Sequence, residues 1–203
     1  MLLRKIDYDS VRGKYVLLRD DFNVQIENGK IVDSFRIDAS MPTIKHLISN
    51  GARVVICAHL GRPKGKHDDS LSLRPIAEYM NIPFIDDCLK KDFLRDMKNG
   101  DLVLMENLRF YKGEEENDDS FAKKLAEGFD IYVNDAFAVS HRAAASTVGI
   151  TKYLPSFAGD LLVSDRKYFK CDGKARTSIY CFCWWCKGFV KNRCAKKTGY
   201  NRR

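Results

Sequence analysis

The sequence predicts an α/β domain built on a doubly wound, mostly parallel, Rossmann-like sheet, and three observations lead to this fold class. Short apolar runs alternate with longer amphipathic stretches, as in strand–helix–strand units. Glycines stand where several of the amphipathic stretches end. Four of the apolar runs are followed directly by clusters of Arg, His, Asn or Asp. Together these features predict strands that carry a binding site at their carboxyl ends.

The first strand–helix–strand unit is predicted near the amino terminus. A strand at 15–18 is followed by an Asn-Gly turn within 26–31, since both residue types tolerate positive φ. A helix is predicted at 36–50 because its apolar residues recur on one face, and Gly51 takes the C′ position after it. A strand at 53–58 completes the unit.

The following residues continue the alternation. Helices are predicted at 72–80, with Pro75 in the first turn, at 89–98 and at 119–128. Short strands are predicted at 82–85, 102–106 and 131–133. The acidic run at 114–116 is predicted to be a solvated turn that begins a helix.

Charge and cysteine content divide the chain into two parts. The chain has 35 Lys and Arg residues against 27 Asp and Glu residues, but the stretch from Cys171 onward has nine basic residues and one acidic residue, Asp172. The first 170 residues are therefore electrically balanced. Five of the seven cysteines and both tryptophans also lie in the last stretch. We predict a domain at 1–170 and a separate basic, Cys- and Trp-rich tail at 171–203.

The predicted domain is long enough to bury a core without disulfides, and its two cysteines, Cys57 and Cys88, lie in or near apolar segments. The amino terminus has no signal-peptide pattern, and no apolar run of 18 residues occurs. We therefore expect a cytoplasmic monomer without membrane or nucleic-acid partners.

The polar clusters after the strands predict one binding site. They lie at 19–23, 59–62, 106–109 and 134–142, and the carboxyl ends of parallel strands converge in space. Arginine guanidinium groups bind phosphate or carboxylate oxygens in bidentate fashion, while Asp and Asn side chains suit a hydroxyl group. The candidate residues are Asp21, Asn23, Arg36, His59, Arg62, Arg109 and Arg142. This composition predicts a small anionic ligand.

Several motifs carry a resemblance to a known family. They are Arg-Asp-Asp-Phe-Asn-Val at 19–24, Arg36-Ile37, Pro-Thr-Ile at 42–44, His-Leu-Gly-Arg-Pro-Lys-Gly at 59–65, Glu-Asn-Leu-Arg-Phe at 106–110, Glu-Glu-Glu-Asn at 114–117 and Tyr-Val-Asn-Asp-Ala-Phe at 132–137 with His141-Arg142. In order and spacing, over about 165 residues, they resemble the amino-terminal domain of phosphoglycerate kinases. The resemblance implies a glycolytic phosphotransferase of two Rossmann-like lobes.

The resemblance also implies a role for each candidate residue. Asp21 and Asn23 would hold the hydroxyl and carboxylate end of 3-phosphoglycerate, and Arg36 would be catalytic, neutralising charge on the phosphoryl group in transfer. The phosphate would be held by His59, Arg62, Arg109 and Arg142. ATP or ADP with magnesium would bind the second lobe, so we expect no cofactor on this chain and no turnover by this chain alone.

Three departures from the family pattern predict a weakened site. Asp20 stands where the family usually has Val or a similar residue, and Gln25 stands where it has Pro. After Phe137 the family has Gly-Thr-Ala-His-Arg-Ala-His, whereas this chain has Ala-Val-Ser-His-Arg-Ala-Ala at 138–144. A buried strand Asp and a lost glycine are both expected to lower affinity.

The tail has two competing interpretations. Cys181, Cys183, Cys186 and Cys194 could supply thiolates to zinc beside nucleic-acid-binding basic residues, although a Cys-x-Cys pair is short for a zinc knuckle. Alternatively, the tail is a frameshifted reading of the family's continuation, because a shift by one base turns Trp184-Trp185-Cys186 into Gly-Gly followed by Val or Ala. The frameshift is the preferred hypothesis. A chain with no function of its own remains a third alternative.

Overall fold

The computed structural model describes residues 4–27 and 29–164. The predicted tail at 171–203 lies outside these residues, together with its zinc and frameshift interpretations and the boundary near residue 170.

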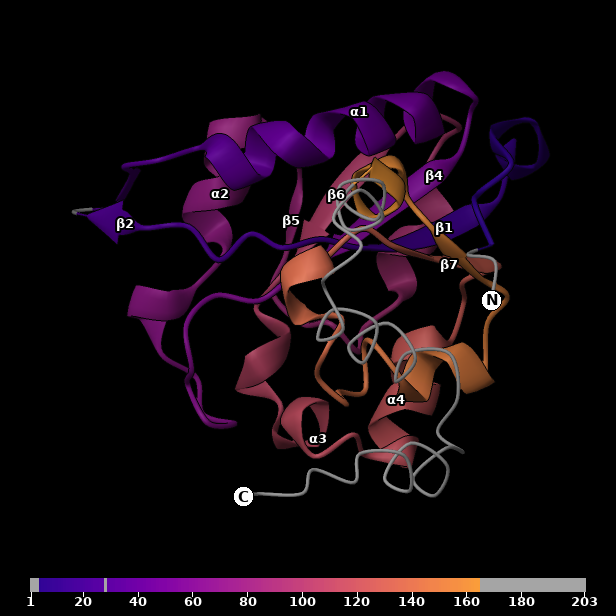
Figure 1. Ribbon diagram of the computed structural model, residues 1–203. Helices are drawn as coiled ribbons and strands as arrows, with labels where there is room; N and C mark the ends of the chain where they lie inside the picture. Colours follow the sequence, from indigo (N-terminus) through magenta and orange to yellow (C-terminus); the bar gives the residue numbers. More distant parts are fainter. Residues whose placement is uncertain (1–3, 28, 165–203) are drawn as a thin grey trace, which may run out of the picture.

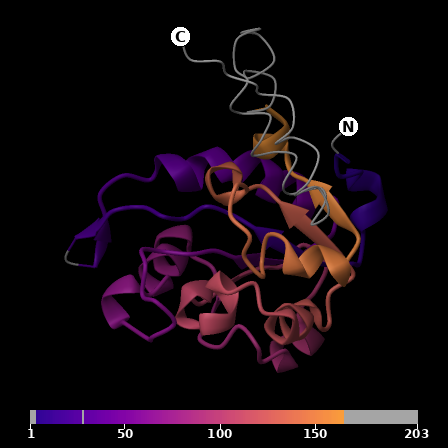
Figure 2. The same cartoon turned by 60° about the horizontal axis from the view of Figure 1, so that its bottom comes forward.

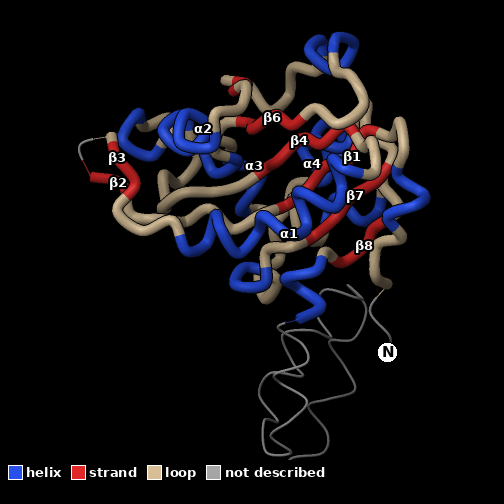
Figure 3. Tube along the Cα trace, turned by 90° about the horizontal axis from the view of Figure 1, so that it is seen from above, coloured by secondary structure: helices blue, strands red, loops and turns tan. Residues whose placement is uncertain are grey.

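A six-stranded parallel sheet forms the centre of the fold (Figure 1). Its strands are β1 (Tyr15–Arg19), β4 (Arg53–Cys57), β5 (Phe84–Ile85), β6 (Leu102–Met105), β7 (Ile131–Asn134) and β8 (Ser156–Ala158), in the spatial order β5-β6-β4-β1-β7-β8. Every neighbouring pair is parallel. Figure 3 shows β4 and β7 on either side of β1. The carboxyl ends of these three central strands therefore open onto one edge of the sheet.

Helices cover both faces of the sheet. They are α1 (Phe35–Ser49), α2 (Arg74–Met80), α3 (Lys112–Glu115) and α4 (Asp119–Ala126). Helices α1 and α2 lie over one face, whereas α3 and α4 lie over the other (Figure 2). Gly51 ends α1 with a φ of 76°, as predicted from its C′ position, and the Asp118 side chain caps α4 by accepting from the Phe121 N–H.

Strand β1 illustrates how the pleat builds the two core layers. Val16 and Leu18 point to the side that Ile44 of α1 covers, while Leu17 points to the side that Leu125 of α4 covers. All of these side chains are fully buried. A parallel sheet buried on both faces needs such continuous apolar runs, and the predicted doubly wound α/β class is confirmed.

Two short strands on either side of the predicted turn form a small hairpin, separate from the main sheet, as predicted. Its strands β2 (Ile26–Glu27) and β3 (Lys30–Ile31) pair antiparallel, and Gly29 has a φ of 73°. The hairpin follows β1 and precedes α1 in the sequence, and its strand β2 lies at the far left of Figure 1, away from the main sheet.

One helix and one strand differ notably from the sequence prediction. The predicted helix at 89–98 is a 3-10 helix at Asp92–Asp96. It does not continue, because the Leu94 carbonyl accepts from the Tyr15 hydroxyl at 2.8 Å and the Lys98 N–H donates to the Asp101 carboxylate at 2.6 Å. Strand β8 was not predicted. It is three residues long, pairs with β7 and hydrogen-bonds the amino-terminal segment at Arg4 and Ile6, contacts that local pattern does not reveal.

The prediction of a solvated acidic turn at 114–116 is wrong for Glu114. This residue lies in α3 and is only 2% exposed. Its carboxylate accepts hydrogen bonds from the hydroxyl and N–H of Ser146, which compensate for its burial. Glu115 and Glu116, in contrast, are solvent-accessible and form ion pairs with Arg109 and Lys112.

Within 4–27 and 29–164, none of the helices has the length and apolar character needed to cross a membrane.

Candidate anion-binding site

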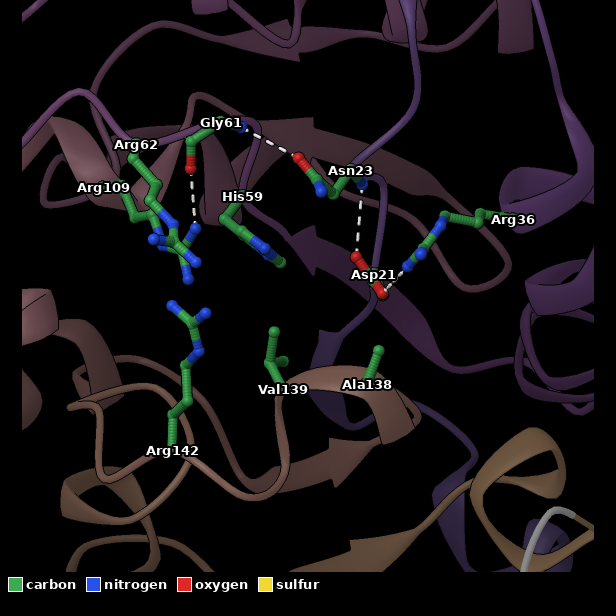
Figure 4. Close-up of a pocket in the computed structure, with 10 residues that line it drawn as sticks. All are labelled: Asp21, Asn23, Arg36, His59, Gly61, Arg62, Arg109, Ala138, Val139 and Arg142. Carbon is green, nitrogen blue, oxygen red and sulfur yellow. Dashed lines mark hydrogen bonds and ion pairs between the residues drawn. The ribbon is translucent and has the colours of Figure 1, made fainter.

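A cavity of about 260 Å³ opens at the carboxyl ends of the central strands (Figure 4). It is lined by Asp21, Asn23, Arg36, His59, Gly61, Arg62, Arg109, Ala138, Val139 and Arg142. All seven candidate residues from the sequence are therefore brought together. Gly61, Ala138 and Val139 line the cavity in addition. The first of these lies inside the predicted 59–65 motif, and the other two lie where the sequence departs from the family pattern.

Four successive loops and one helix supply these side chains. Asp21 and Asn23 follow β1, and His59 to Arg62 follow β4. Arg109 lies in the 3-10 helix at Leu108–Phe110 after β6, and Arg142 lies in the loop after β7. Arg36 stands at the start of α1, the helix that follows the hairpin. The parallel order of the strands explains why residues more than 100 positions apart share one cavity.

At the end of the cavity formed by the loop after β1, the Asp21 carboxylate organises the neighbouring side chains. Asp21 is 8% exposed, and its Oδ2 forms an ion pair with Nη1 of Arg36. Its Oδ1 accepts from the Asn23 N–H at 3.2 Å. The Asn23 Oδ1 in turn accepts from the Gly61 N–H at 2.9 Å, which leaves the Asn23 amide NH₂ as the donor available to a ligand. Arg36 is thus oriented by Asp21, and Asn23 links two loops.

The 59–65 loop depends on glycine at position 61. Gly61 has a φ of 59°, and a Cβ there would lie 2.7 Å from Cδ2 of Leu71. Its carbonyl oxygen accepts from Nη1 of Arg109 at 2.6 Å. Through its N–H and its carbonyl group, Gly61 therefore joins Asn23 to Arg109 and sets the spacing of the loops around the cavity.

The cations gather at the opposite end of the cavity. Figure 4 shows Arg62, Arg109 and Arg142 directed toward one another, away from the Asp21–Arg36 pair. Arg109 is 6% exposed, and burial together with neighbouring Arg142 lowers its pKa, although a guanidinium stays charged at neutral pH. Within the described ranges, the side chains of Arg62 and Arg142 form no hydrogen bond or ion pair. Their charges are available to an anion.

His59 is held neutral between the two ends. It is 3% exposed, and burial, reinforced by Arg19 and Arg109, lowers its pKa far below the usual value for histidine. Its Nδ1 lies 3.1 Å from Nη2 of Arg19, a buried residue outside the cavity lining. The imidazole therefore offers the cavity a neutral side chain rather than a further cation.

The donor set suits an oxyanion and does not suit a divalent cation. The cavity lining contains four guanidinium groups and only one carboxylate, that of Asp21. Mg²⁺ instead binds carboxylate, carbonyl and water oxygens. In the described part of the chain, no cluster of three or more His, Cys, Asp or Glu side chains is placed to hold a metal. The cavity is therefore rich in hydrogen-bond donors and cationic groups, the chemistry that phosphate and carboxylate groups match.

Fold and site together define a class: an α/β domain with an arginine-rich cavity at the carboxyl edge of a parallel sheet. The model of the phosphoglycerate kinase family matches residues 6–178, most of the sequence. This chain belongs to the phosphoglycerate kinase family, as its motifs predicted.

Known relatives support the same assignment. The chain is 46% identical over 171 residues to a phosphoglycerate kinase of Borrelia garinii, a match covering 80% of this chain and 44% of that protein. It is 50% identical over 167 residues to a phosphoglycerate kinase of Wolbachia pipientis, covering 78% and 42%. The chain thus spans less than half the length of these relatives.

Solved structures agree with the fold. The structure of phosphoglycerate kinase from Coxiella burnetii matches with a TM-score of 0.71 and 42% identity, over 79% of this chain and 42% of that one. The enzyme from Pyrococcus horikoshii matches with a TM-score of 0.68 and 32% identity, over 79% and 43%.

Proposed function

We propose that this chain forms the 3-phosphoglycerate-binding domain of a glycolytic, cytoplasmic phosphoglycerate kinase. The observation that carries the proposal is the division of the cavity into two chemically different ends. The cluster of Arg62, Arg109 and Arg142, with neutral His59 beside it, suits a phosphate group. The end formed by Asp21, Asn23 and Arg36 suits the hydroxyl and carboxylate groups of the same small ligand.

Arg36 is the proposed catalytic residue. Phosphoryl transfer is accelerated mainly by positioning and by charge stabilisation at the transferring group. The Arg36 side chain is 44% exposed, so a group arriving from outside the domain can reach it, and its ion pair with Asp21 holds it at the carboxylate end. There it would neutralise charge on a phosphoryl group passing to or from the substrate carboxylate.

We further propose that Mg-ATP or Mg-ADP binds a second lobe, as the family resemblance implies, and not the domain described above. We therefore propose that this chain alone, a monomer, binds 3-phosphoglycerate without turnover. A coupled assay with 3-phosphoglycerate, ATP and Mg²⁺ measures this directly. Turnover by the purified chain would contradict the proposal.

Binding is tested by isothermal titration calorimetry with 3-phosphoglycerate. Arg62→Ala is expected to weaken affinity by about tenfold, since it removes a charge-assisted hydrogen-bond partner of phosphate. Arg62 is exposed, so its removal is expected to leave the fold intact. The matched control is Arg95→Ala, an exposed arginine in the 3-10 helix outside the cavity, which is expected to bind as the unaltered chain does. Equal affinities in the two variants would refute the assigned phosphate end.

A further inference from the structure

A chain of buried hydrogen bonds runs from α3 to the cavity through Glu114, Ser146, Arg19 and His59. We propose that Glu114, Ser146 and Arg19 are positioning residues that hold His59 as the Nε2–H tautomer, so that His59 donates a hydrogen bond to the phosphate of the ligand. The part concerning the ligand rests on the function proposed above. The part concerning the tautomer is independent of it.

The chain of contacts starts at Glu114, which is 2% exposed. Its Oε1 accepts from the Ser146 hydroxyl at 2.6 Å, and its Oε2 accepts from the Ser146 N–H at 2.9 Å. An ionised carboxylate only accepts hydrogen bonds. The hydroxyl proton of Ser146 is therefore directed at Glu114, which leaves the lone pairs of that hydroxyl for another donor.

Arg19 supplies that donor. It is 1% exposed, and its Nε donates to the Ser146 hydroxyl oxygen at 2.9 Å. Its Nη1 donates to the main-chain carbonyl group of Asp20. The guanidinium is thus held by two partners, and the negative charge of Glu114 lies one hydroxyl group away. A buried cation requires compensation of this kind.

The remaining contact determines the protonation of His59. Nη2 of Arg19 lies 3.1 Å from Nδ1 of His59. A guanidinium has donors and no acceptor, so Nδ1 must be the unprotonated nitrogen. In a neutral imidazole the proton then lies on Nε2. The low pKa of His59, caused first by burial and then by Arg19 and the cavity arginines, agrees with the neutral form.

The tautomer of His59 decides whether its ring attracts or repels a bound phosphate. A neutral Nε2–H donates to an oxyanion without adding a charge that the neighbouring arginines would repel. The opposite tautomer would present a lone pair to the phosphate and would repel it. Preorganising the donor before the ligand arrives removes the cost of ordering it during binding. Arg19, Ser146 and Glu114 would therefore affect affinity without touching the ligand.

Two conservative variants test the arrangement. Ser146→Ala removes the hydroxyl that joins Arg19 to Glu114. Glu114→Gln keeps the shape of the side chain but adds amide donors opposite the Ser146 hydroxyl and N–H. Ser140→Ala is the matched control, because Ser140 is a buried serine of the loop after β7 whose hydroxyl bonds to Ala136 and Asn134 and not to Arg19. Circular dichroism verifies that each variant folds.

The first readout is the tautomer itself, measured on the full chain at pH 7 by long-range ¹H–¹⁵N NMR of the histidine rings. A His59→Gln variant assigns the His59 signals by their loss. We expect a protonated Nε2 and an unprotonated Nδ1 in the unaltered chain and in Ser140→Ala, and a mixture of tautomers in Ser146→Ala and Glu114→Gln. An Nδ1–H or doubly protonated His59 in the unaltered chain would refute the proposal, as would an unchanged tautomer in both test variants.

The second readout is calorimetry with 3-phosphoglycerate. Ser146→Ala and Glu114→Gln are each expected to raise the Kd for 3-phosphoglycerate about fivefold, which corresponds to the loss of one hydrogen bond. Ser140→Ala is expected to leave the Kd unchanged. A shifted tautomer with unchanged affinity would refute the role of His59 as a donor. If the unaltered chain fails to bind 3-phosphoglycerate while its tautomer responds as expected, the proposed function fails and the positioning of His59 stands.

Discussion

The buried carboxyl group of Asp20 lowers the stability of this domain. It follows β1 directly and is fully buried, and neither of its carboxylate oxygens has a hydrogen-bond partner among residues 4–27 and 29–164. Burial, and then the nearby Asp135 carboxyl group, raises the pKa of Asp20 well above its usual value. An unpartnered buried polar group costs free energy whichever form it adopts.

Replacing Asp20 by valine, the residue type that the family pattern favours there, is expected to stabilise the domain. The change removes an unsatisfied carboxyl group and keeps a similar volume, so the free energy of unfolding should rise by about 1–3 kcal/mol at pH 7. Urea unfolding of the variant and of the unaltered chain measures this change in the free energy of unfolding. Asp20→Asn, which cannot ionise but remains polar, should give a smaller gain. A loss of stability in Asp20→Val would show that the carboxyl group has a compensating partner.

At the scale of an element, the 59–65 loop is the part of the site most sensitive to backbone change. Gly61→Ala is expected to lower the free energy of unfolding by about 1–3 kcal/mol. The alanine would have to adopt a positive φ, and its Cβ would lie too close to the Leu71 side chain. It should also weaken 3-phosphoglycerate binding, since Gly61 bonds both Asn23 and Arg109. Urea unfolding and calorimetry provide the two measurements.

Gly29→Ala is the control for that change. Gly29 has a φ of 73°, but a Cβ added there would meet nothing within 4 Å, and the hairpin that contains it contributes no residue to the cavity. The variant should show the cost of positive φ alone, about 1 kcal/mol. If Gly29→Ala destabilises the domain or weakens binding as much as Gly61→Ala does, the contact with Leu71 and the link between loops are not responsible.

At the scale of the whole molecule, Asp135 is expected to make stability fall as pH rises. Burial raises its pKa to about 6 in the folded domain, so between its usual pKa and pH 6 the folded chain holds a proton that the unfolded chain has released. The stability that this proton contributes is present below about pH 4 and is lost as pH rises through about 6.

Asp135→Asn tests this dependence, because an Asn Oδ1 can still accept from the Leu162 N–H, as the Asp135 Oδ1 does. Relative to the unaltered chain, the variant should gain about 2 kcal/mol of unfolding free energy between pH 4 and pH 7. Urea unfolding over this pH range measures the difference. A constant difference between the two chains would contradict the raised pKa.

Much of the fold and of the site could be predicted because their signals are local. Apolar runs of strand length, the turn at Asn28-Gly29 and the glycine after α1 predicted the order of elements over most of the described chain. The positions of the arginines directly after strands predicted that they would gather at one edge.

The sequence by itself determined the alternation of strands and helices, the family and the set of residues at the cavity, because periodicity and strand-end position depend on near neighbours. Only the tertiary structure decided that Glu114 is buried, that the helix predicted at 89–98 is shorter, and that Arg19 lies within hydrogen-bond distance of His59. The physical reason is distance along the chain. The Arg19–Ser146 hydrogen bond joins residues 127 positions apart, and such a pairing exists only once β1 lies beside β4 and β7.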